Sequence, residues 1–348
     1  MQSPQYKLLN FDQIDQWDRI VESHHRGSIL QTTAMIRAQL ASRHHFPYAI
    51  GAVNADGRLL AILNATRIVT MSGLGSQIAS RSIMYAEPLY EDSQVGLQAA
   101  EQLVAAHDRY MSKRTLFAEV RPIFGRGPQM DPLLLGGYEK LGYVNYELPL
   151  CPCEDTLFRQ LGQKRRNNVR SAARKGVLVS HATGPAAIPE MYSLLCASYS
   201  RSKLPIVDQS LFCSVAEQLD ASRFRIYTAN FEGRPVATCC FLTFKDRVIC
   251  WYAGTLRIPG VAAMSSVFWH SMRTYAAEGY KIFDFAGGGW EGQEYGPGKF
   301  KSKFGGIETH HGRYRKVYAP WKLRVASAVY DRVRDLIAPK SKTVSSGT

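Results

Sequence analysis

The sequence predicts an α/β protein built from two related halves, each a mixed sheet with helices packed against it. Two segments carry the first sign of this repeat: residues 48–66, "YAIGAVNADGRLLAILNAT", and residues 224–242, "FRIYTANFEGRPVATCCFL". When they are aligned, Asp56-Gly57-Arg58 falls on Glu232-Gly233-Arg234. Apolar, β-prone runs flank an acidic-Gly turn in both, which is typical of a hairpin.

The segments that follow the two hairpins repeat as well. In the first half, apolar residues recur every three or four positions over 96–114 and predict a helix, after which 115–120 and 138–150 predict strands. In the second half, a helix is expected over 264–280, a strand over 281–286 and a closing segment over 300–317. Because the order hairpin, helix, strand, loop, strand occurs twice, we expect two domains, over 1–152 and 153–320.

A basic helix is predicted over 155–175, at the start of the second half. Seven Lys and Arg residues and no acid lie between Arg159 and Lys175, while Asp155 can cap the start and Gly176 can end the helix. Like charges at helical spacing repel one another, so this segment favours a bound anion. The candidate phosphate or tRNA contacts are Lys164, Arg165, Arg166, Arg170 and Arg174. A merely solvated linker helix is the alternative.

Composition and chain ends set further expectations. Lys and Arg exceed Asp and Glu by 14, which indicates an anionic partner, although a protein that is simply basic remains an alternative. The odd count of seven cysteines favours a reducing compartment. No signal peptide and no apolar run of membrane-spanning length is present, so we expect a protein of the cytoplasm or of the inner membrane face. We also expect it to be a monomer. After Pro320, residues 321–340 predict an amphipathic basic helix that packs on the body or rests on an anionic inner membrane face, followed by a tail over 341–348.

Several motifs resemble Fem-type peptidoglycan aminoacyltransferases. They are "ILQTTAMIRAQL" near the start, "RRNNVRSAARKGV" at the start of the second half, and "FDFAGG" followed by "GKFKSKFGG" near the end. The resemblance implies a tandem pair of acetyltransferase-like (GNAT) folds. It also implies transfer of an amino acid from aminoacyl-tRNA to a cell-wall precursor, or a related acyl transfer in envelope glycan assembly.

The resemblance also implies site residues. Arg37, Arg201 and Tyr252 stand at or near family positions that contact the substrate, and Tyr295, Lys299 and Lys303 flank the closing motif. The family aspartate that precedes the proline after the first central strand is replaced by Arg121, so Glu119 or Asp284 would supply any carboxylate.

The residues themselves favour direct amine attack on an activated acyl group. No Gly-x-Ser-x-Gly elbow or cysteine in a catalytic motif is present, which argues against a covalent intermediate. A positioned cation is what the developing oxyanion needs. We therefore expect Lys301 to face the acyl group, Phe300 to anchor the turn at 294–306, and Asp284 to act as a buried carboxylate; a solvated lysine cluster is the alternative.

The sequence is compatible with three functions. The first is an aminoacyl-tRNA-dependent transferase acting on a phosphorylated nucleotide-sugar or lipid-linked acceptor. The second is an acyl-CoA N-acyltransferase, for which "TLRIPGVAAMSS" (255–266) offers Arg257, Gly260 and Ala262 as a weak pyrophosphate loop. The third is a non-catalytic nucleic-acid-binding protein, for which no recognition motif is present. We expect no metal and no tightly bound cofactor, with aminoacyl-tRNA or acyl-CoA as co-substrate.

Overall fold

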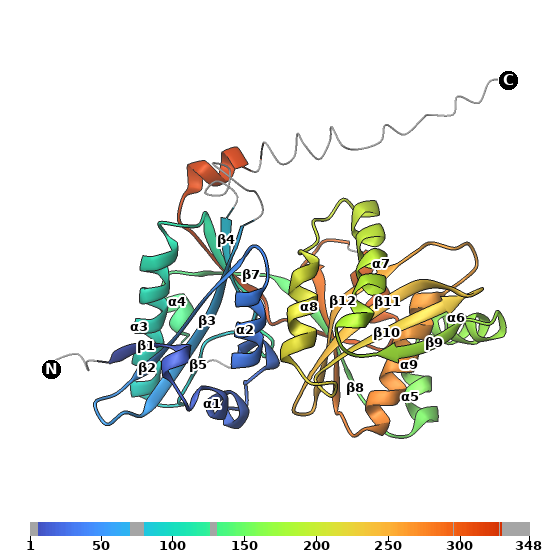
Figure 1. The fold of residues 1–348 in the computed structure, drawn as a ribbon, viewed down its shortest axis with the longest axis horizontal. Coiled ribbons are helices and arrows are strands. Elements are labelled where there is room, and N and C mark those ends of the chain that lie inside the picture. Colours follow the sequence, from blue (N-terminus) through green and yellow to red (C-terminus); the bar gives the residue numbers. More distant parts are fainter. Residues whose placement is uncertain (1–5, 70–79, 126–130, 295, 327, 329–348) are drawn as a thin grey trace.

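Two α/β halves lie side by side in the computed structural model, which describes residues 6–69, 80–125, 131–294, 296–326 and 328 (Figure 1). The first half holds β1 (Lys7–Asn10), α1 (Trp17–Ser23), α2 (Thr33–Ala41), β2 (His45–Val53), β3 (Leu59–Val69), β4 (Ser80–Met84), β5 (Leu89–Tyr90), α3 (Gln94–Met111), β6 (Phe117–Val120), α4 (Pro132–Leu135) and β7 (Glu139–Leu141).

After β7 the chain crosses to the second sheet, and at its end it returns to the first. This stretch holds β8 (Tyr143–Pro149), α5 (Glu154–Gln160), α6 (Gln163–Arg174), β9 (Leu178–Ala182), α7 (Ile188–Arg201), α8 (Gln209–Gln218), β10 (Phe224–Phe231), β11 (Arg234–Phe244), β12 (Arg247–Thr255), α9 (Ala263–Ala277), β13 (Ile282–Trp290), α10 (Gly296–Ser302), β14 (Ile307–Thr309) and β15 (Arg313–Val317).

Both predicted hairpins are confirmed. Strands β2 and β3 pair antiparallel, as do β10 and β11. Gly57 and Gly233 take positive φ values of 79° and 73° in the two turns, a conformation that glycine adopts without steric cost. The α/β class with mixed sheets is confirmed as well, because each sheet contains one parallel pair, β4 with β6 and β12 with β13.

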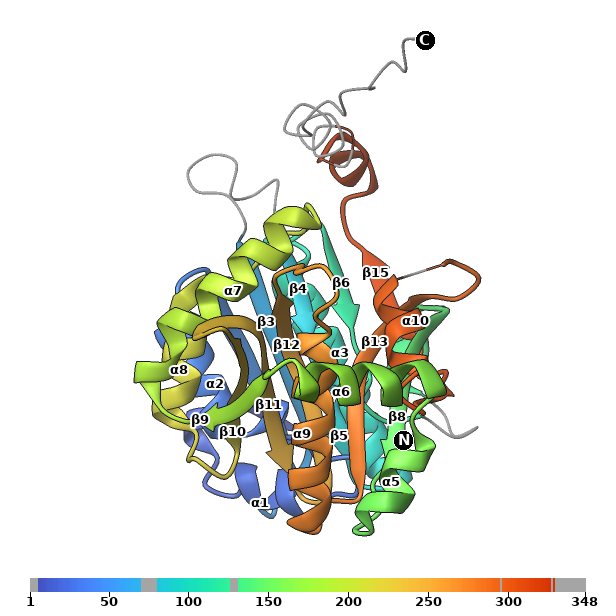
Figure 2. The ribbon, with the colours of Figure 1, turned by 90° about the vertical axis from the view of Figure 1, so that its right-hand side faces the viewer.

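The two halves exchange their last strands. The first sheet has the order β1-β2-β3-β4-β6-β15-β7, with β5 beside β3, and the second has the order β14-β8-β13-β12-β11-β10-β9. Strand β8 thus lies between strands of the second half, and β15 lies between β6 and β7 of the first (Figures 1 and 2). The sheets do not separate at one point of the chain, so the boundary at residue 152 stays a prediction about the sequence repeat.

Three apolar cores hold the molecule together. One lies within each half, and a third joins them, because Trp17 and Ile36 of the first half belong to the same buried cluster as Phe212 and Leu242 of the second. Helices α2 and α8 meet at this junction, where the backbone N–H of Arg43 donates to Ser210 Oγ at 2.8 Å. The halves therefore share a hydrophobic interface in addition to the exchanged strands.

The predicted basic helix over 155–175 is two helices, which corrects that expectation. Leu161 is extended and Gly162 separates α5 from α6. The break has a tertiary cause: the Gly162 N–H donates to the carbonyl of Lys303 at 3.0 Å, and a Cβ at Gly162 would lie 2.9 Å from that oxygen. Asp155 lies in the first turn of α5 rather than at its cap, whereas Gly176 ends α6 with a φ of 79°, as expected.

The chain after β15 leaves the body. Residues 320–326 are helical, and the side chains of Trp321 and Val325 are 67% and 54% exposed. The apolar face expected to pack on the body is therefore open over these described residues, and the rest of the predicted helix and the tail lie outside them. No described helix is long and apolar enough to cross a bilayer.

Candidate active site

A cavity of about 460 Å³ opens between the two halves. Its position follows from the two parallel strand pairs. Strands β12 and β13 pair only from Arg247 with Ile282 to Ile249 with Asp284, although both run on well beyond this point. The residues after the point of separation, Cys250–Ala253 and Phe285–Gly287, line the cavity. Tyr85 and Arg121, which directly follow the parallel pairing of β4 with β6, line it from the first half.

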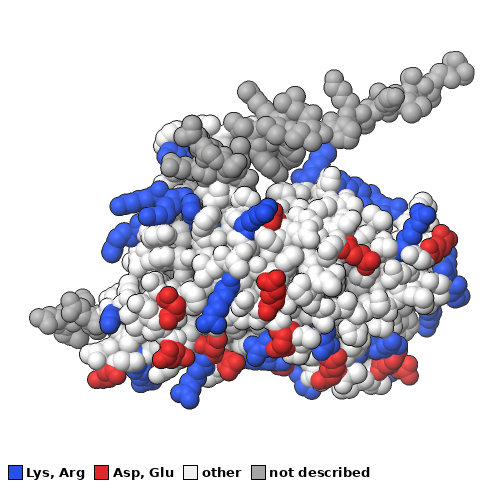
Figure 3. All heavy atoms as spheres, viewed as in Figure 1, with Lys and Arg blue, Asp and Glu red and all other residues white. Residues whose placement is uncertain are grey.

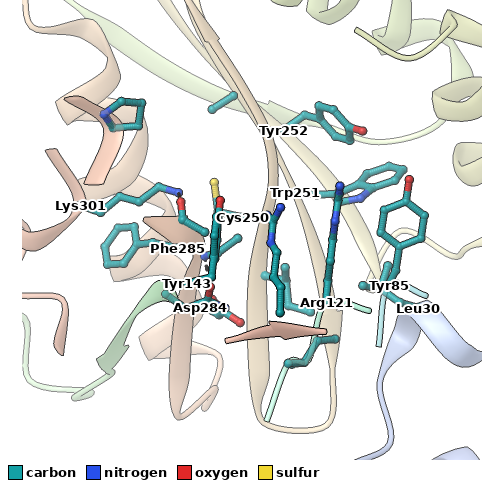
Figure 4. A pocket seen from close by; sticks show the side chains of 18 of the residues that line it. Leu30, Tyr85, Arg121, Tyr143, Cys250, Trp251, Tyr252, Asp284, Phe285 and Lys301 are labelled. Atoms are coloured by element: carbon teal, nitrogen blue, oxygen red, sulfur yellow. Dashed lines mark hydrogen bonds between the residues drawn. The ribbon is translucent and has the colours of Figure 1, made fainter. Parts of the chain in front are cut away.

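Lys301 enters this cavity from α10, as Figure 4 shows. Its Nζ donates a hydrogen bond to the carbonyl of Gly287 at 2.6 Å. Burial lowers the pKa of this ammonium, while Asp284 and the nearby Cys250 act in the opposite direction. A cation held in a partly dehydrated site interacts more strongly with a negative charge than it would in water. Lys301 therefore lies in a cavity rather than in bulk solvent, and its contact with an acyl group stays a prediction.

Helix α10 is held close to β13 by packing that the sequence only partly revealed. We expected a turn over 294–306, and the structure has a short helix followed by a turn. Gly298 permits the approach, since a Cβ there would collide with the carbonyl of Gly288. Phe304 is fully buried, and Phe300 packs on the same core, with its ring centroid 5.0 Å from that of Phe304. Arg165 covers Phe300 at 4.0 Å.

Asp284 lines the cavity near Lys301 and is 2% exposed. Burial raises the pKa of its carboxyl, and Arg247, whose Nη1 lies 3.3 Å from Oδ2, opposes that shift. Its Oδ1 accepts the backbone N–H of Ala286 at 2.7 Å. A carboxyl with a raised pKa beside a cavity is a candidate proton acceptor.

A second carboxylate, that of Glu147, forms an ion pair with Arg247. Glu147 on β8 lies 2.8 Å from Arg247 Nη1 and 3.1 Å from His311 Nε2. Although burial acts to raise it, the pKa of Glu147 is lowered by His311 and Arg247. His310 and His311 lie in the connection between β14 and β15, and each contacts a glutamate.

An arginine cluster forms the wall contributed by the first half. Glu119, 4% exposed, pairs with Arg121 Nε at 2.8 Å, Arg313 Nη1 at 3.2 Å and Arg315 Nη2 at 2.9 Å. Burial alone would raise the pKa of Glu119, but the three guanidinium groups hold it at about 2. Arg313 also stacks on Tyr143 at 3.6 Å.

Sequence reasoning did not single out Arg313 as a site residue. The available signal was the alternation in "RYRKV". It places Arg313 and Arg315 on one face of β15, opposite Tyr314, which is buried in the core of the first half.

The remaining candidate residues divide into those near the cavity and those away from it. Tyr252 lines the cavity on β12. Arg201 is exposed at the end of α7, where it donates to Ser198 Oγ at 3.4 Å, and Ser198 is a lining residue. Arg37 is exposed on α2 and does not line the cavity. Lys299 is exposed and pairs with Glu294 at 2.6 Å, Lys303 is exposed, and Tyr295 lies outside the described residues.

The five cations expected to contact phosphate do not form one surface. Arg166 Nη1 donates to the carbonyls of Arg159 and Leu161, and so closes the end of α5. Arg165 is half-buried over Phe300, whereas Lys164, Arg170 and Arg174 are exposed. Figure 3 shows Lys and Arg gathered at the edge of the second half, in the region where Figure 1 places α6.

A constellation that resembles a hydrolase triad occurs in the first half. Ser82 Oγ lies 2.9 Å from His107 Nε2, and His107 Nδ1 lies 3.1 Å from Asp108 Oδ1. Ser82 and His107 are fully buried, so a substrate carbonyl has no access to the hydroxyl. Burial lowers the pKa of His107 despite the adjacent Asp108. The arrangement is a satisfied polar group of the core rather than a nucleophile.

Comparison with known proteins agrees with this geometry. Residues 163–300, from the start of α6 to the residue before Lys301, match the acetyltransferase (GNAT) domain family. The crystal structure of FemX is similar to this chain, with 12% identity, a TM-score of 0.66, and coverage of 94% of this chain and 100% of the other. The chain has a tandem GNAT fold. The predicted similarity to Fem-type proteins is thereby confirmed at the level of the fold.

Two further structures have the same arrangement over most of the chain. A tandem GNAT protein from the clavulanic acid biosynthesis pathway has 9% identity and a TM-score of 0.55, covering 90% of this chain and 99% of its own. The C-terminal domain of a putative lysylphosphatidylglycerol synthetase from Agrobacterium fabrum has 14% identity and a TM-score of 0.53, covering 92% and 95%. No curated protein matches the sequence.

We expect Glu119→Gln to destabilise the protein by about 2 to 4 kcal/mol, because three guanidinium groups would lose their shared counter-charge; their partial exposure moderates the loss. Since the pKa of Glu119 falls from its usual 4.5 to about 2, its contribution is complete above pH 4.5 and is lost as the pH falls toward 2. Urea denaturation at several pH values measures the difference. The matched variant Glu294→Gln, in an exposed pair, should leave stability unchanged, and an equal loss in both variants would contradict this account.

Proposed function

We propose that the protein is an acyl or aminoacyl transferase that forms an amide bond by direct attack of an amine on an activated acyl group. The observation that carries the proposal is the ammonium of Lys301, held in the cavity where β12 and β13 separate. The acetyltransferase domain match over residues 163–300 and the tandem GNAT fold support the same reaction class. A purely nucleic-acid-binding protein has no need of a partly buried cation in a cavity between two halves.

The proposed reaction has two steps. The neutral amine attacks the acyl carbon, a C–N bond forms, and the carbonyl electron pair moves to oxygen. Collapse of this tetrahedral species breaks the bond to the leaving group, a ribose oxygen of tRNA or the sulfur of CoA. The proton lost by nitrogen passes to a base and then to the leaving atom.

Two side chains of the cavity have the properties that these steps require. Lys301 would stabilise the oxyanion, because its charge is fixed by the hydrogen bond to Gly287 and is partly shielded from water. Asp284 would accept the proton of the attacking nitrogen, since it lines the same cavity and burial raises the pKa of its carboxyl. Arg247 would keep that carboxylate in place.

Aminoacyl-tRNA is the donor we favour. Lys164, Arg170 and Arg174 are exposed on α6, and a phosphate backbone would supply the negative charge that this helix lacks. The acceptor would be an amine on a phosphorylated cell-envelope precursor, handled by a protein of the cytoplasm or of the inner membrane face. The likeness to FemX, and to the domain of a putative lysylphosphatidylglycerol synthetase, supports an envelope acceptor.

Acyl-CoA is the second candidate donor, and one observation favours it. The loop after β12 leads directly into α9, where Ala262 provides no side-chain cap for the first N–H groups. Gly260 in this loop has a φ of 73°, and its carbonyl accepts a hydrogen bond from Lys175 Nζ at 2.7 Å. A helix start without a side-chain cap, with a lysine nearby, suits a pyrophosphate.

We expect Lys301→Met to lower kcat by about 100-fold or more, because the oxyanion would lose its charge partner. Steady-state turnover measures this effect, with aminoacyl-tRNA or acyl-CoA as the donor, whichever supports activity. Circular dichroism checks that the variant is folded. The matched variant is Lys281→Met, which removes an exposed lysine directly before β13, the strand whose Gly287 carbonyl accepts the hydrogen bond from Lys301. This variant should retain turnover. Near-normal activity of a folded Lys301→Met protein would refute the proposed role.

The pH dependence of turnover should report Asp284. Because burial raises its pKa above the usual 3.8, the carboxylate is lost by protonation as the pH falls through that higher value, and kcat/KM should decline on this acidic limb. In Asp284→Asn the limb should disappear and the rate should drop by about 100-fold or more, as for a lost general base. An unchanged limb in the variant would assign it to another group.

Donor choice can be decided by binding. If aminoacyl-tRNA is the donor, its dissociation constant should rise steeply between about 50 and 200 mM salt, and Lys164→Gln with Arg174→Gln should reduce that slope. The exposed Arg19→Gln in α1 is the matched control. Affinity that is flat with salt, together with a thermal shift produced by acetyl-CoA, would favour the second donor.

A further inference from the structure

The cavity wall formed by the first half carries more positive charge than its neighbours neutralise. Three guanidinium groups, from Arg121, Arg313 and Arg315, surround the single carboxylate of Glu119. Within the described parts of the chain, Glu119 is the only carboxylate that pairs with Arg121 or Arg313. Two of the three therefore line the cavity without a full counter-charge.

Their geometry leaves donors available. Arg121 pairs with Glu119 through Nε, and Arg313 does so through Nη1, whereas each guanidinium group has five N–H donors. The guanidinium carbon of Arg313 lies 3.6 Å from the ring centroid of Tyr143. Arg121 lies 5.6 Å from the ring centroid of Tyr85. Side chains fixed in this way lose little rotamer freedom when they bind a ligand.

The register of the sheet explains why two like charges meet here. Strand β15 pairs antiparallel with β6, with Tyr314 opposite Val120 and Arg315 opposite Glu119. One step further along this register, Arg313 falls opposite Arg121. Like charges that face one another across a strand pair are destabilising unless an anion separates them. Among the residues that the structure describes, Glu119 alone supplies that anion for the whole group.

The geometry points to an oxyanion subsite at Arg121 and Arg313, which binds a carboxylate or phosphate group of the substrate on the wall opposite Lys301. Figure 4 shows Lys301 reaching toward Cys250 and Arg121 entering the cavity from a different side, after β6 of the first half. Paired guanidinium groups suit the bidentate geometry of both kinds of oxyanion. This inference rests on the proposed function and specifies the class of its substrate. One of the two substrates, acceptor or donor, carries a carboxylate or phosphate that binds Arg121 and Arg313 while the amide bond forms near Lys301.

The rest of the cavity agrees with an anionic ligand. Its only lining carboxylate among the described residues is Asp284, which is engaged by Arg247 and an N–H of the backbone. The lining cations are Arg121, Arg313 and Lys301. A ligand without a negative charge would leave this excess uncompensated in a partly dehydrated site.

The test is the binding of two probes, inorganic phosphate and succinate, by isothermal titration calorimetry at constant ionic strength set with sodium chloride. We expect at least one probe to bind, and Arg121→Met and Arg313→Met each to weaken it by about 10- to 100-fold, the range for a lost charge-assisted hydrogen bond. Tighter phosphate binding would indicate a phosphorylated substrate, and tighter succinate binding a carboxylate. Binding of neither probe above the chloride control would overturn the subsite.

Arg315→Met is the matched control, because Arg315 pairs with the same Glu119 but does not line the cavity. It should leave probe affinity unchanged, and an equal loss in all three variants would show that the cluster is only structural. If Arg121→Met does not fold, Arg121→Lys retains the charge beside Glu119 and should still weaken binding by losing the planar fork.

Lys301→Met separates this inference from the proposed function. It should still bind the probe with nearly unchanged affinity while turnover is lost. If Lys301→Met retains turnover and Arg121→Met binds the probe weakly, the catalytic role of Lys301 is contradicted and the subsite is supported. If Lys301→Met loses turnover and Arg121→Met binds the probe normally, only the subsite is contradicted.

Discussion

The exchange of β8 and β15 between the two sheets is the constraint on which the site depends. Because β15 leaves the second half and pairs with β6, Arg313 is delivered to the wall opposite Lys301, although only twelve positions separate the two residues in the chain. Because β8 enters the second sheet, Glu147 reaches Arg247 and, through it, the carboxylate Asp284. Each wall of the cavity thus contains a strand from the other half of the sequence.

The cavity itself arises from strand separation. Backbone hydrogen bonds hold β12 and β13 together over three residue pairs and then stop, which frees main-chain groups and side chains to face a ligand. Lys301 occupies part of this opening through its bond to Gly287. Burial of its ammonium costs desolvation, and that cost is offset when a negative charge develops beside it, as in the tetrahedral intermediate of acyl transfer.

Local sequence signals predicted the elements well and their partners less well. The acidic-Gly turns at Gly57 and Gly233 located both hairpins, and "FKSKFGG" located Lys301 in the cavity region. The break at Gly162 could not be predicted, because it depends on the carbonyl of Lys303 far along the chain. The exchanged strands could not be predicted either, since strand order is set by long-range pairing and not by propensity.

Runs of charged residues were the least informative signal in the sequence, because the contacts of each charge are also set by residues far along the chain. Arg165 and Arg166 read as phosphate ligands beside Lys164, yet one covers Phe300 and the other closes the end of α5. Arg313, in a short run on the last strand, lines the cavity. Only the three-dimensional neighbours of a cation show whether its charge is already used.

The most direct measurement of the central claim is a crystal structure of the protein with a phosphonate analogue of the tetrahedral intermediate. The account predicts a phosphonyl oxygen about 3 Å from Lys301 Nζ, within hydrogen-bonding distance, with the analogue lying in the cavity between the two halves. An analogue bound outside this cavity, or one inside it whose oxygens all lie beyond hydrogen-bonding reach of Lys301, would contradict the account.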